Sequence, residues 1–128
     1  MAILFSTISI LISVILNVFA QVLLKKSVNG IALDYTLHGL FSFLFKLSGV
    51  FSFWLGILLL FFALGTWLIA LKNLPLSIVY PFTAMSIIFV ALASARHLGE
   101  TITPVGILGF VLIISGVLVL FASFYGKL

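Results

Sequence analysis

The sequence has no cysteine and very little charge. Its 128 residues include six basic and two acidic side chains, so charged residues make up 6% of the chain, whereas a soluble domain normally carries about 25%. Without cysteine there is no disulfide framework, no thiolate chemistry and no cysteine-ligated metal site. Because so few charges cannot cover a soluble surface, the composition indicates an integral membrane protein.

The charges that are present are scattered along the chain. The net charge is +4 at pH 7 and no run of lysine and arginine occurs, which excludes nucleic-acid binding because that requires a basic cluster on one face. The positive balance fits anchoring to anionic lipid headgroups. No arrangement resembles a nucleophile triad, a phosphate-binding loop or a pair of catalytic carboxylates, so the sequence predicts neither an enzyme nor a bound cofactor or metal.

Hydrophobic residues fill the space between the charges. They make up 65% of the chain, and the long uncharged runs are 1–24, 47–71, 73–95 and 101–128, the last broken only by Lys127. Each run supplies the roughly 20 apolar residues of a spanning helix, and none shows the alternation of a barrel strand. The sequence therefore predicts an all-α membrane protein, one domain over 1–128, with four transmembrane helices at about 3–24, 49–71, 75–95 and 103–124. The first is expected to be a retained span and not a signal peptide.

The segment 34–47, between the first two predicted spans, is too short and too polar to cross a bilayer. Asp34, His38 and Lys46 occur there among leucines and phenylalanines, which is typical of an amphipathic or re-entrant helix lying in the membrane interface. Basic residues favour a cytoplasmic location for the first and third connections by the positive-inside rule. The four on that side, against Lys72 and Lys127 on the other, are Lys25, Lys26, Lys46 and Arg96.

A line of polar side chains crosses the first predicted span. Beginning at Ser6, it recurs every four residues from Ser13 through Asn17 and Gln21 to Lys25, and this spacing places the groups on one face of a helix. In one interpretation the stripe lines a substrate cavity, where the two amides donate and accept and Lys25 meets a phosphate. In the other, the amides bond to neighbouring helices and Lys25 extends to the headgroups.

The third predicted span carries an internal proline and several hydroxyl groups. Pro81 frees the carbonyl of Ser77 and should kink the helix, and Tyr80, Thr83 and Ser86 flank it. Such a helix either moves between states and touches a ligand, or holds a static kink. No acid lies within a predicted span. Asp34 is in a connection, and Glu100 joins Arg96 and His97 in a cluster expected to be solvated.

Small residues in the fourth predicted span suggest a contact with another helix. Gly109 and Gly116 are seven residues apart with Ile113 between them on the same side, and small residues at this spacing allow close helix approach. A four-helix chain of this size is too thin to enclose a translocation path alone. The sequence therefore predicts a dimer interface at Gly109, Ile113 and Gly116.

The order and spacing of several motifs resemble the small multidrug resistance branch of the drug/metabolite transporter superfamily. The motifs are Asn17-x-x-Ala20-Gln21-x-x-x-Lys25, Pro75-x-x-x-x-Tyr80-Pro81, Leu98-Gly99-Glu100-x-x-Thr103 and Gly109-x6-Gly116. The resemblance implies a four-helix protomer that pairs into a dimer, with the first three helices around a substrate chamber and the fourth at the dimer contact. It also implies that Tyr80 is a chamber residue.

One departure from that family narrows the resemblance. The family's drug exporters carry an acid in the first helix that binds proton and drug in turn, and the matching position here is Asn17. The chain is therefore more similar to the aminoarabinose-phosphoundecaprenol flippase subunits, which lack that acid. This resemblance implies transport of a polyprenyl-phosphate-linked sugar across a bacterial inner membrane, by a homodimer or by a heterodimer with a paralogue.

The sequence thus predicts a small, multi-pass inner-membrane transporter that moves a lipid-linked or amphipathic substrate through a polar chamber. The alternatives are a proton-coupled exporter of drugs or cations, which needs a coupling group other than a buried acid, and a non-transporting scaffold subunit. The predicted substrate-binding residues are Ser13, Asn17, Gln21, Lys25, Tyr80 and Thr83.

Overall fold

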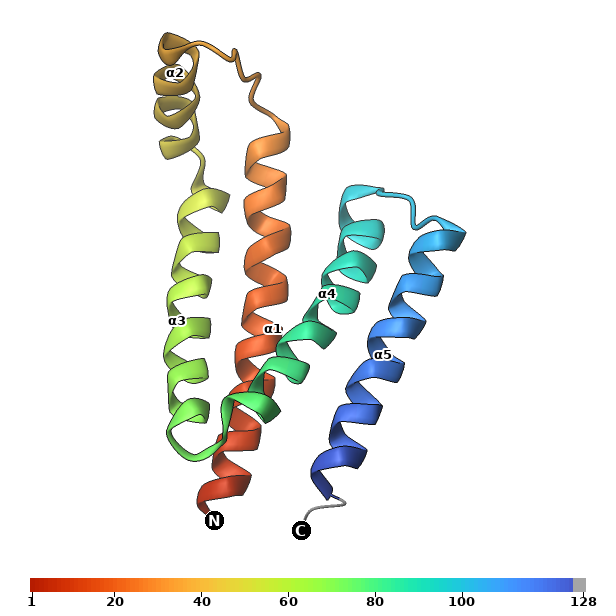
Figure 1. Cartoon of the computed structure of the whole chain (residues 1–128). Helices are drawn as coiled ribbons and strands as arrows, with labels where there is room; N and C mark the ends of the chain where they lie inside the picture. Colours follow the sequence, from red (N-terminus) through yellow and green to blue (C-terminus); the bar gives the residue numbers. More distant parts are fainter. Residues whose placement is uncertain (126–128) are drawn as a thin grey trace.

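The computed structural model describes residues 1–125, and within that range the regular structure is all helix, with no strand (Figure 1). The helices are α1 (Ala2–Asn29), α2 (Leu37–Ser48), α3 (Phe51–Asn73), α4 (Leu76–Leu98) and α5 (Pro104–Tyr125). Three of them, α1, α3 and α4, are long and apolar enough to cross a bilayer. This confirms the all-α class and a multi-pass membrane protein.

The helix ends follow local sequence signals. The hydroxyl oxygen of Thr36 accepts from the backbone N–H of Gly39 at 3.0 Å and caps α2, and Thr103 does the same for Gly106 at 3.1 Å at the start of α5, which satisfies amides that have no helical partner. Gly99 ends α4 with a φ of 70°, a left-handed conformation that glycine adopts without strain. Only α1 is clearly longer than predicted, because Lys25 and Lys26 are good helix formers that continue it to Asn29.

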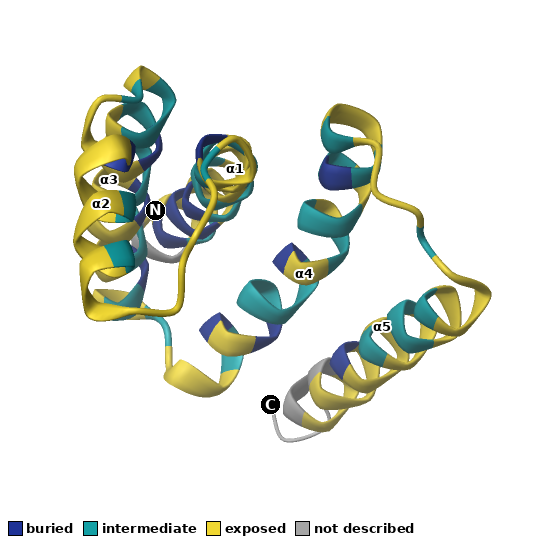
Figure 2. Ribbon diagram, turned by 90° about the horizontal axis from the view of Figure 1, so that it is seen from above, coloured by how far each residue is buried: buried dark blue, intermediate teal, exposed yellow. Residues whose placement is uncertain are grey.

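The central helix is α1, which packs chiefly against α3 and more obliquely against α4. The α5 helix lies beyond α4 and packs on it, so α4 separates α1 from α5 (Figure 2). Small residues allow the α1–α3 approach, because Ala20, Gly56, Ala63 and Ala70 are all buried. A Cβ built on Gly56 would lie 2.9 Å from Cδ2 of Leu24. The tight packing of these two helices therefore depends on the missing side chain of Gly56.

Two polar contacts join α1 to α3. Ser13 Oγ donates to the carbonyl oxygen of Ala63 at 2.8 Å, and Asn73 Nδ2 donates to Ser6 Oγ at 3.0 Å. Near the second contact, Ile10, Ala70 and Val79 form a small apolar core at the end of the bundle that carries the α3–α4 turn. Two members of the polar stripe, Ser6 and Ser13, thus bond between helices, whereas the second interpretation of the stripe assigned such bonds to its amides.

Removing the Asn73 amide should have a small effect on stability. We expect Asn73→Ala to lower the free energy of unfolding by about 0.6 kcal/mol, the typical value for a hydrogen bond between membrane helices. The neighbouring substitution Lys72→Ala, which removes an exposed side chain, should change it by less. Reversible unfolding in mixed micelles measures both. Equal effects of the two substitutions would contradict a role for the Asn73–Ser6 bond.

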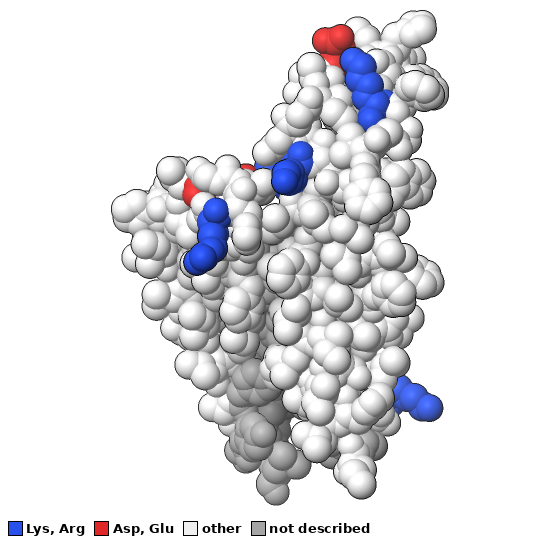
Figure 3. Space-filling model, turned by 180° about the vertical axis from the view of Figure 1, so that it is seen from behind, with Lys and Arg blue, Asp and Glu red and all other residues white. Residues whose placement is uncertain are grey.

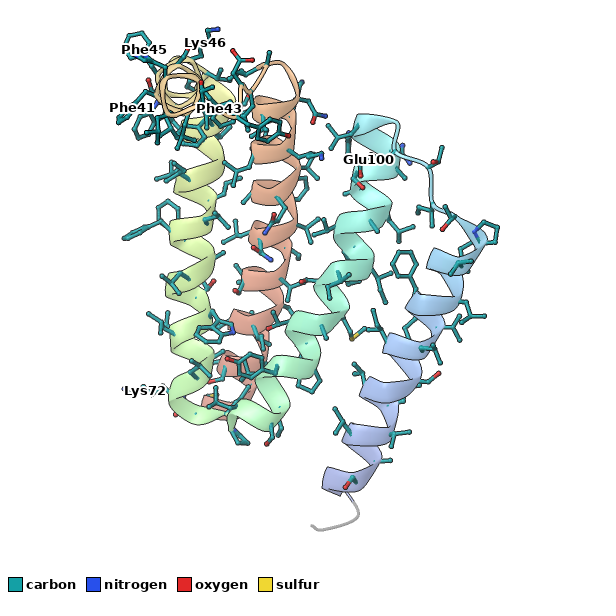
Figure 4. All side chains as sticks on the ribbon, turned by 45° about the horizontal axis from the view of Figure 1, so that its top comes forward. Phe41, Phe43, Phe45, Lys46, Lys72 and Glu100 are labelled. Atoms are coloured by element: carbon teal, nitrogen blue, oxygen red, sulfur yellow. The ribbon has the colours of Figure 1, made fainter. Side chains whose placement is uncertain are left out.

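The short helix α2 occupies the segment predicted to be interfacial. It runs across the end of α3 and is seen end-on in Figure 4. Trp54 Nε1 donates to the carbonyl oxygen of Ser48 at 2.7 Å and Leu47 is buried, which ties the end of α2 to α3. Phe41 and Phe45 point away from the bundle and are mostly exposed (Figure 4). An apolar surface of this kind suits the lipid interface, and the interfacial position stays a prediction.

The charged side chains gather toward the end of the bundle that carries the α1–α2 and α4–α5 connections (Figure 3). Lys72 lies at the opposite end, beside the α3–α4 turn (Figure 4). Lys127, the other basic residue expected on the same side as Lys72, lies outside the described residues. The described charges therefore have the asymmetry that the positive-inside rule requires for a cytoplasmic location of the charged end.

Candidate functional site

The polar stripe of α1 is divided between two pockets. The first lies between α1, α3 and α4, and we call it the mid-helix pocket. Its volume is about 330 Å³. Its lining residues are Ser13, Val14, Asn17, Leu60, Ala63, Leu64, Trp67, Thr83 and Ser86. A pocket of this size within an apolar bundle, with a few polar groups converging on it, is typical of a ligand site.

The hydroxyl groups of the mid-helix pocket share one hydrogen-bonding pattern. Ser13 donates to Ala63 O at 2.8 Å, Thr83 to Val79 O at 3.2 Å and Ser86 to Thr83 O at 2.6 Å. Each hydroxyl has a single hydrogen and two lone pairs. Because these hydrogens are engaged by backbone carbonyls, the hydroxyl oxygens can offer a ligand only acceptors.

Asn17 differs from the hydroxyls because its amide is unengaged. It is half-buried in the pocket wall, and it makes no side-chain hydrogen bond to any residue in 1–125. An asparagine amide has two N–H donors and one carbonyl acceptor. The mid-helix pocket thus combines several acceptors with one free amide and has no charged group in its lining, a set that suits neutral polar groups such as sugar hydroxyls.

The proline of α4 stands one turn before Ser86 and close to Thr83. Pro81 is buried and its missing N–H cannot bond the carbonyl of Ser77. The helix nonetheless continues from Leu76 to Leu98, and it crosses α1 obliquely (Figure 1). This oblique crossing brings the Thr83 and Ser86 segment of α4 against the middle of α1, where Asn17 lies.

The second pocket lies nearer the charged end of the bundle, and we call it the end pocket. Its volume is about 180 Å³ and it lies between α1 and the last turns of α4. Its lining residues are Gln21, Val22, Lys25, Val90, Ser94, Leu98 and Glu100. The other half of the α1 stripe, Gln21 and Lys25, therefore faces this smaller and more polar space.

Lys25 and Glu100 form an ion pair across the mouth of the end pocket. Lys25 Nζ lies 3.8 Å from Glu100 Oε1, and the side chains are 54% and 47% exposed. Glu100 stands beside the end of α4 on the side that faces α1 (Figure 4). An ion pair with this exposure is worth about 0–1 kcal/mol. It can therefore open at little cost.

Arg96, His97 and Glu100 are all exposed, as the predicted solvated cluster requires, but the ion-pair partner of Glu100 is Lys25 of α1. Helix α4 ends at Leu98, so Glu100 lies outside it and not on a helical face with Arg96. The pairing of Glu100 with Lys25 follows from the order and direction of the helices. Along the chain, α3 comes between α1 and α4 and runs antiparallel to both. Helices α1 and α4 therefore run parallel to each other, and their C-terminal ends lie at the same end of the bundle.

The structure brings together most of the predicted substrate-binding residues. Ser13, Asn17 and Thr83 share the mid-helix pocket, and Gln21 and Lys25 share the end pocket.

Tyr80 lines neither pocket and is 57% exposed. Its ring packs edge-on against Trp67, with centroids 6.4 Å apart, and Trp67 lines the mid-helix pocket. From the sequence, Trp67 is expected in an aromatic belt near the end of its helix, and its place in the pocket lining has no sequence signal.

An apolar groove of about 350 Å³ adjoins the mid-helix pocket. Its lining residues are Leu11, Val14, Ile15, Val18, Phe19 and Phe89. Val14 belongs to both the groove and the mid-helix pocket. A pocket that carries several polar groups and a groove that carries none therefore meet at one residue of α1, an arrangement that can accept a molecule with a polar head and an apolar tail.

These features define a multi-pass helical membrane protein with a pocket between its helices that carries a few polar groups, and comparison with known proteins agrees with that class. The chain is 38% identical over 69 residues to proteins from Salmonella paratyphi B and Salmonella typhimurium. Each is named a probable 4-amino-4-deoxy-L-arabinose-phosphoundecaprenol flippase subunit ArnE. Flippase subunits are transporters and not enzymes.

The similarity covers part of each protein. The aligned residues are 52% of this chain and 62% of the length of the curated relatives. No protein-family model matches the chain, and no solved structure matches it at a significant level. The relatives support the resemblance to small drug/metabolite transporters that the motifs suggested.

Proposed function

We propose that this protein is a small bacterial inner-membrane transporter that moves a lipid-linked polar group, of the polyprenyl-phosphate sugar kind, across the bilayer. The observation that carries the proposal is the free amide of Asn17 in a pocket with a few polar groups that adjoins a wholly apolar groove. An unsatisfied polar group inside a membrane protein is costly unless it meets water or a ligand. The names of the relatives, which describe flippase subunits for such a lipid, support the proposal.

The proposed mechanism is non-covalent. The sugar hydroxyls donate to the hydroxyl oxygens of the mid-helix pocket and exchange hydrogen bonds with Asn17, while Lys25 in the end pocket attracts the lipid phosphate. The prenyl tail stays in the groove beside Val14 and in the surrounding lipid. The two pockets lie in succession along α1, so the head group passes from one to the other without entering the hydrocarbon.

The proposal includes the finer architecture that the sequence predicts. The described apolar stretch of α5, Pro104–Leu120, is shorter than the three candidate spans, and we propose that α5 is nevertheless a fourth span, with α2 in the interface. We also propose that the chain is one domain, belongs to the small multidrug resistance branch, and acts as a dimer of identical or paralogous chains. Much of the α5 surface away from α4 is apolar and exposed, as the dimer requires.

The predicted dimer contact can be tested without disturbing the protomer. A Cβ on Gly109 or Gly116 would meet no atom within 4 Å in the monomer, so we expect larger side chains at both positions to leave the packing of the protomer unchanged. We expect Gly109→Leu combined with Gly116→Leu to raise the dimer dissociation constant by about tenfold or more, because overpacking a close helix contact costs about 1–3 kcal/mol. Energy transfer between labelled chains in liposomes measures the equilibrium.

The matched control for the dimer test is Val111→Leu, which enlarges an exposed position elsewhere on α5. It should leave the dissociation constant unchanged. Ile113→Ala, at a half-buried position between the two glycines, should weaken the dimer less than the double substitution. If the double substitution dimerises as well as the wild-type chain, the proposed interface is wrong.

The proposed function is tested by reconstituting the purified protein, alone and with a paralogous subunit, in liposomes that contain an undecaprenyl-phosphate amino sugar. Transport above the level of empty liposomes supports the proposal and excludes a scaffold without transport. The alternative exporter of cations predicts instead that a quaternary amine releases protons from the protein. No acid lines the mid-helix pocket, and the acid of the end pocket, Glu100, is half exposed and paired with Lys25. We therefore expect no such release.

A further inference from the structure

The end pocket carries two opposite charges on different helices. Lys25 projects from α1 and Glu100 follows the end of α4, with 3.8 Å between Nζ and Oε1. Glu100 is one of only two acids in the sequence, and the other, Asp34, lies in the α1–α2 connection. A site that only needs to attract a phosphate has no use for a carboxylate at its mouth, because like charges repel. The acid therefore calls for its own explanation.

We propose that the end pocket recognises a lipid head group that carries both a phosphate and a primary ammonium. The Lys25 ammonium binds the phosphate, and the Glu100 carboxylate binds the ammonium of the ligand. This inference rests on the proposed transport of a lipid-linked polar group and adds the chemical class of that group. The word "amino" in the names of the relatives is consistent with such a ligand.

The geometry favours an exchange of partners. In the free protein the two charges neutralise each other, and both side chains are about half exposed and long enough to separate without moving a helix. A zwitterionic head group replaces one ion pair by two, so every charge has a partner both before and after binding. A head group with a phosphate alone leaves Glu100 without its cation and next to a second anion.

The remaining lining of the end pocket fits the same ligand. Gln21 is exposed to the pocket and offers an amide that donates and accepts. Ser94 is buried, and its hydroxyl donates to the carbonyl oxygen of Ala91 at 3.0 Å, so its oxygen faces a ligand as an acceptor. The other basic groups at this end of α4, Arg96 and His97, do not line the pocket. Lys25 is therefore the cation available to a phosphate there.

The experiment compares lipids that differ only in the amine. Undecaprenyl phosphate carrying a 4-amino sugar and its N-acetyl form are transported in proteoliposomes by the wild-type chain and by Glu100→Gln and Lys25→Ala. We expect the wild type to prefer the free amine by about tenfold or more, the contribution of one charged hydrogen bond. Glu100→Gln should transport both forms equally, and Lys25→Ala should lose both.

Exchanging the charges of positions 25 and 100 tests whether the pair recognises a ligand or only stabilises the fold. The double substitution Lys25→Glu with Glu100→Lys keeps an attractive pair and should keep the thermal stability of the wild type. Because the tail fixes the end at which the phosphate enters, the exchanged pair should not restore the preference for the amine. Full restoration by the exchanged pair, or a preference that persists in Glu100→Gln, overturns the inference.

Phosphatidylethanolamine also carries a phosphate and a primary ammonium, and it provides a second arm with its N-acyl form as the control. If the amine is preferred only with phosphatidylethanolamine and the undecaprenyl lipids are not moved, the head-group recognition holds and the proposed sugar-lipid function fails. If the undecaprenyl lipids are moved with no preference for the amine, the proposed function holds and the recognition fails.

Discussion

Replacing Asn17 with leucine should reduce the initial rate of lipid transport by about tenfold or more. The asparagine amide is the free donor and acceptor of the mid-helix pocket among the described residues. A ligand hydrogen bond lost from an apolar site costs about 1.5 kcal/mol or more when its partner is left unpaired, which is about tenfold. Leucine has a similar size, so the pocket is filled but its polarity is lost.

Two controls on the same helix define this test. Ile12→Ala removes a side chain on α1 that is 43% exposed and lines neither pocket nor the groove, and it should transport at nearly the wild-type rate. Asn17→Gln keeps the amide and should retain part of the activity. The rates are measured in proteoliposomes at equal protein density. Wild-type transport by Asn17→Leu would contradict the role of the amide in the proposed path.

Enlarging Gly56 should have the largest effect on stability. A Cβ at Gly56 already lies 2.9 Å from both Cγ and Cδ2 of Leu24 and 3.4 Å from the backbone oxygen of Ala20. A complete leucine side chain cannot be accommodated there without separating α1 from α3. We expect Gly56→Leu to lower the free energy of unfolding by about 3 kcal/mol, the upper part of the usual range for overpacking.

The same helix offers a matched control in Gly65. A Cβ at Gly65 meets no atom within 4 Å, so Gly65→Leu adds the same side chain to α3 in open space and should not destabilise the fold. Thermal unfolding in detergent, followed by far-ultraviolet circular dichroism, compares the two. Equal stabilities would mean that α1 and α3 do not pack through Gly56 as described here.

The helices could be predicted from the sequence because membrane spans have a strong local signal. Uncharged apolar runs located α1, α3 and α4, and the interruption at Asp34 and Lys46 located the separate helix α2. The four-residue spacing predicted that Ser13, Asn17, Gln21 and Lys25 share a face of α1. In the structure this face of α1 meets α3 and α4. Ser13 and Asn17 line the mid-helix pocket, and Ser13 also bonds to Ala63, whereas Gln21 and Lys25 line the end pocket.

The parts that could not be predicted depend on tertiary contacts. The partner of Lys25 is Glu100, 75 positions later in the sequence, and local spacing pointed instead to Arg96. The same limit applies to Tyr80 and Trp67, because periodicity gives the face of a helix but not which ring is turned toward a cavity. The dimer contact at Gly109, Ile113 and Gly116 stays a prediction.

The central claim is that the Asn17 side of α1 faces a hydrated pocket on the path of a polar head group. The sequence contains no cysteine, so a single cysteine can be introduced into an otherwise unmodified chain. The measurement is the rate at which a charged, membrane-impermeant thiol reagent labels Asn17→Cys and Ile15→Cys in liposomes, with and without the lipid substrate. The account predicts fast labelling at position 17 that the substrate slows, and little labelling at position 15. Equal, slow labelling of the two positions would contradict it.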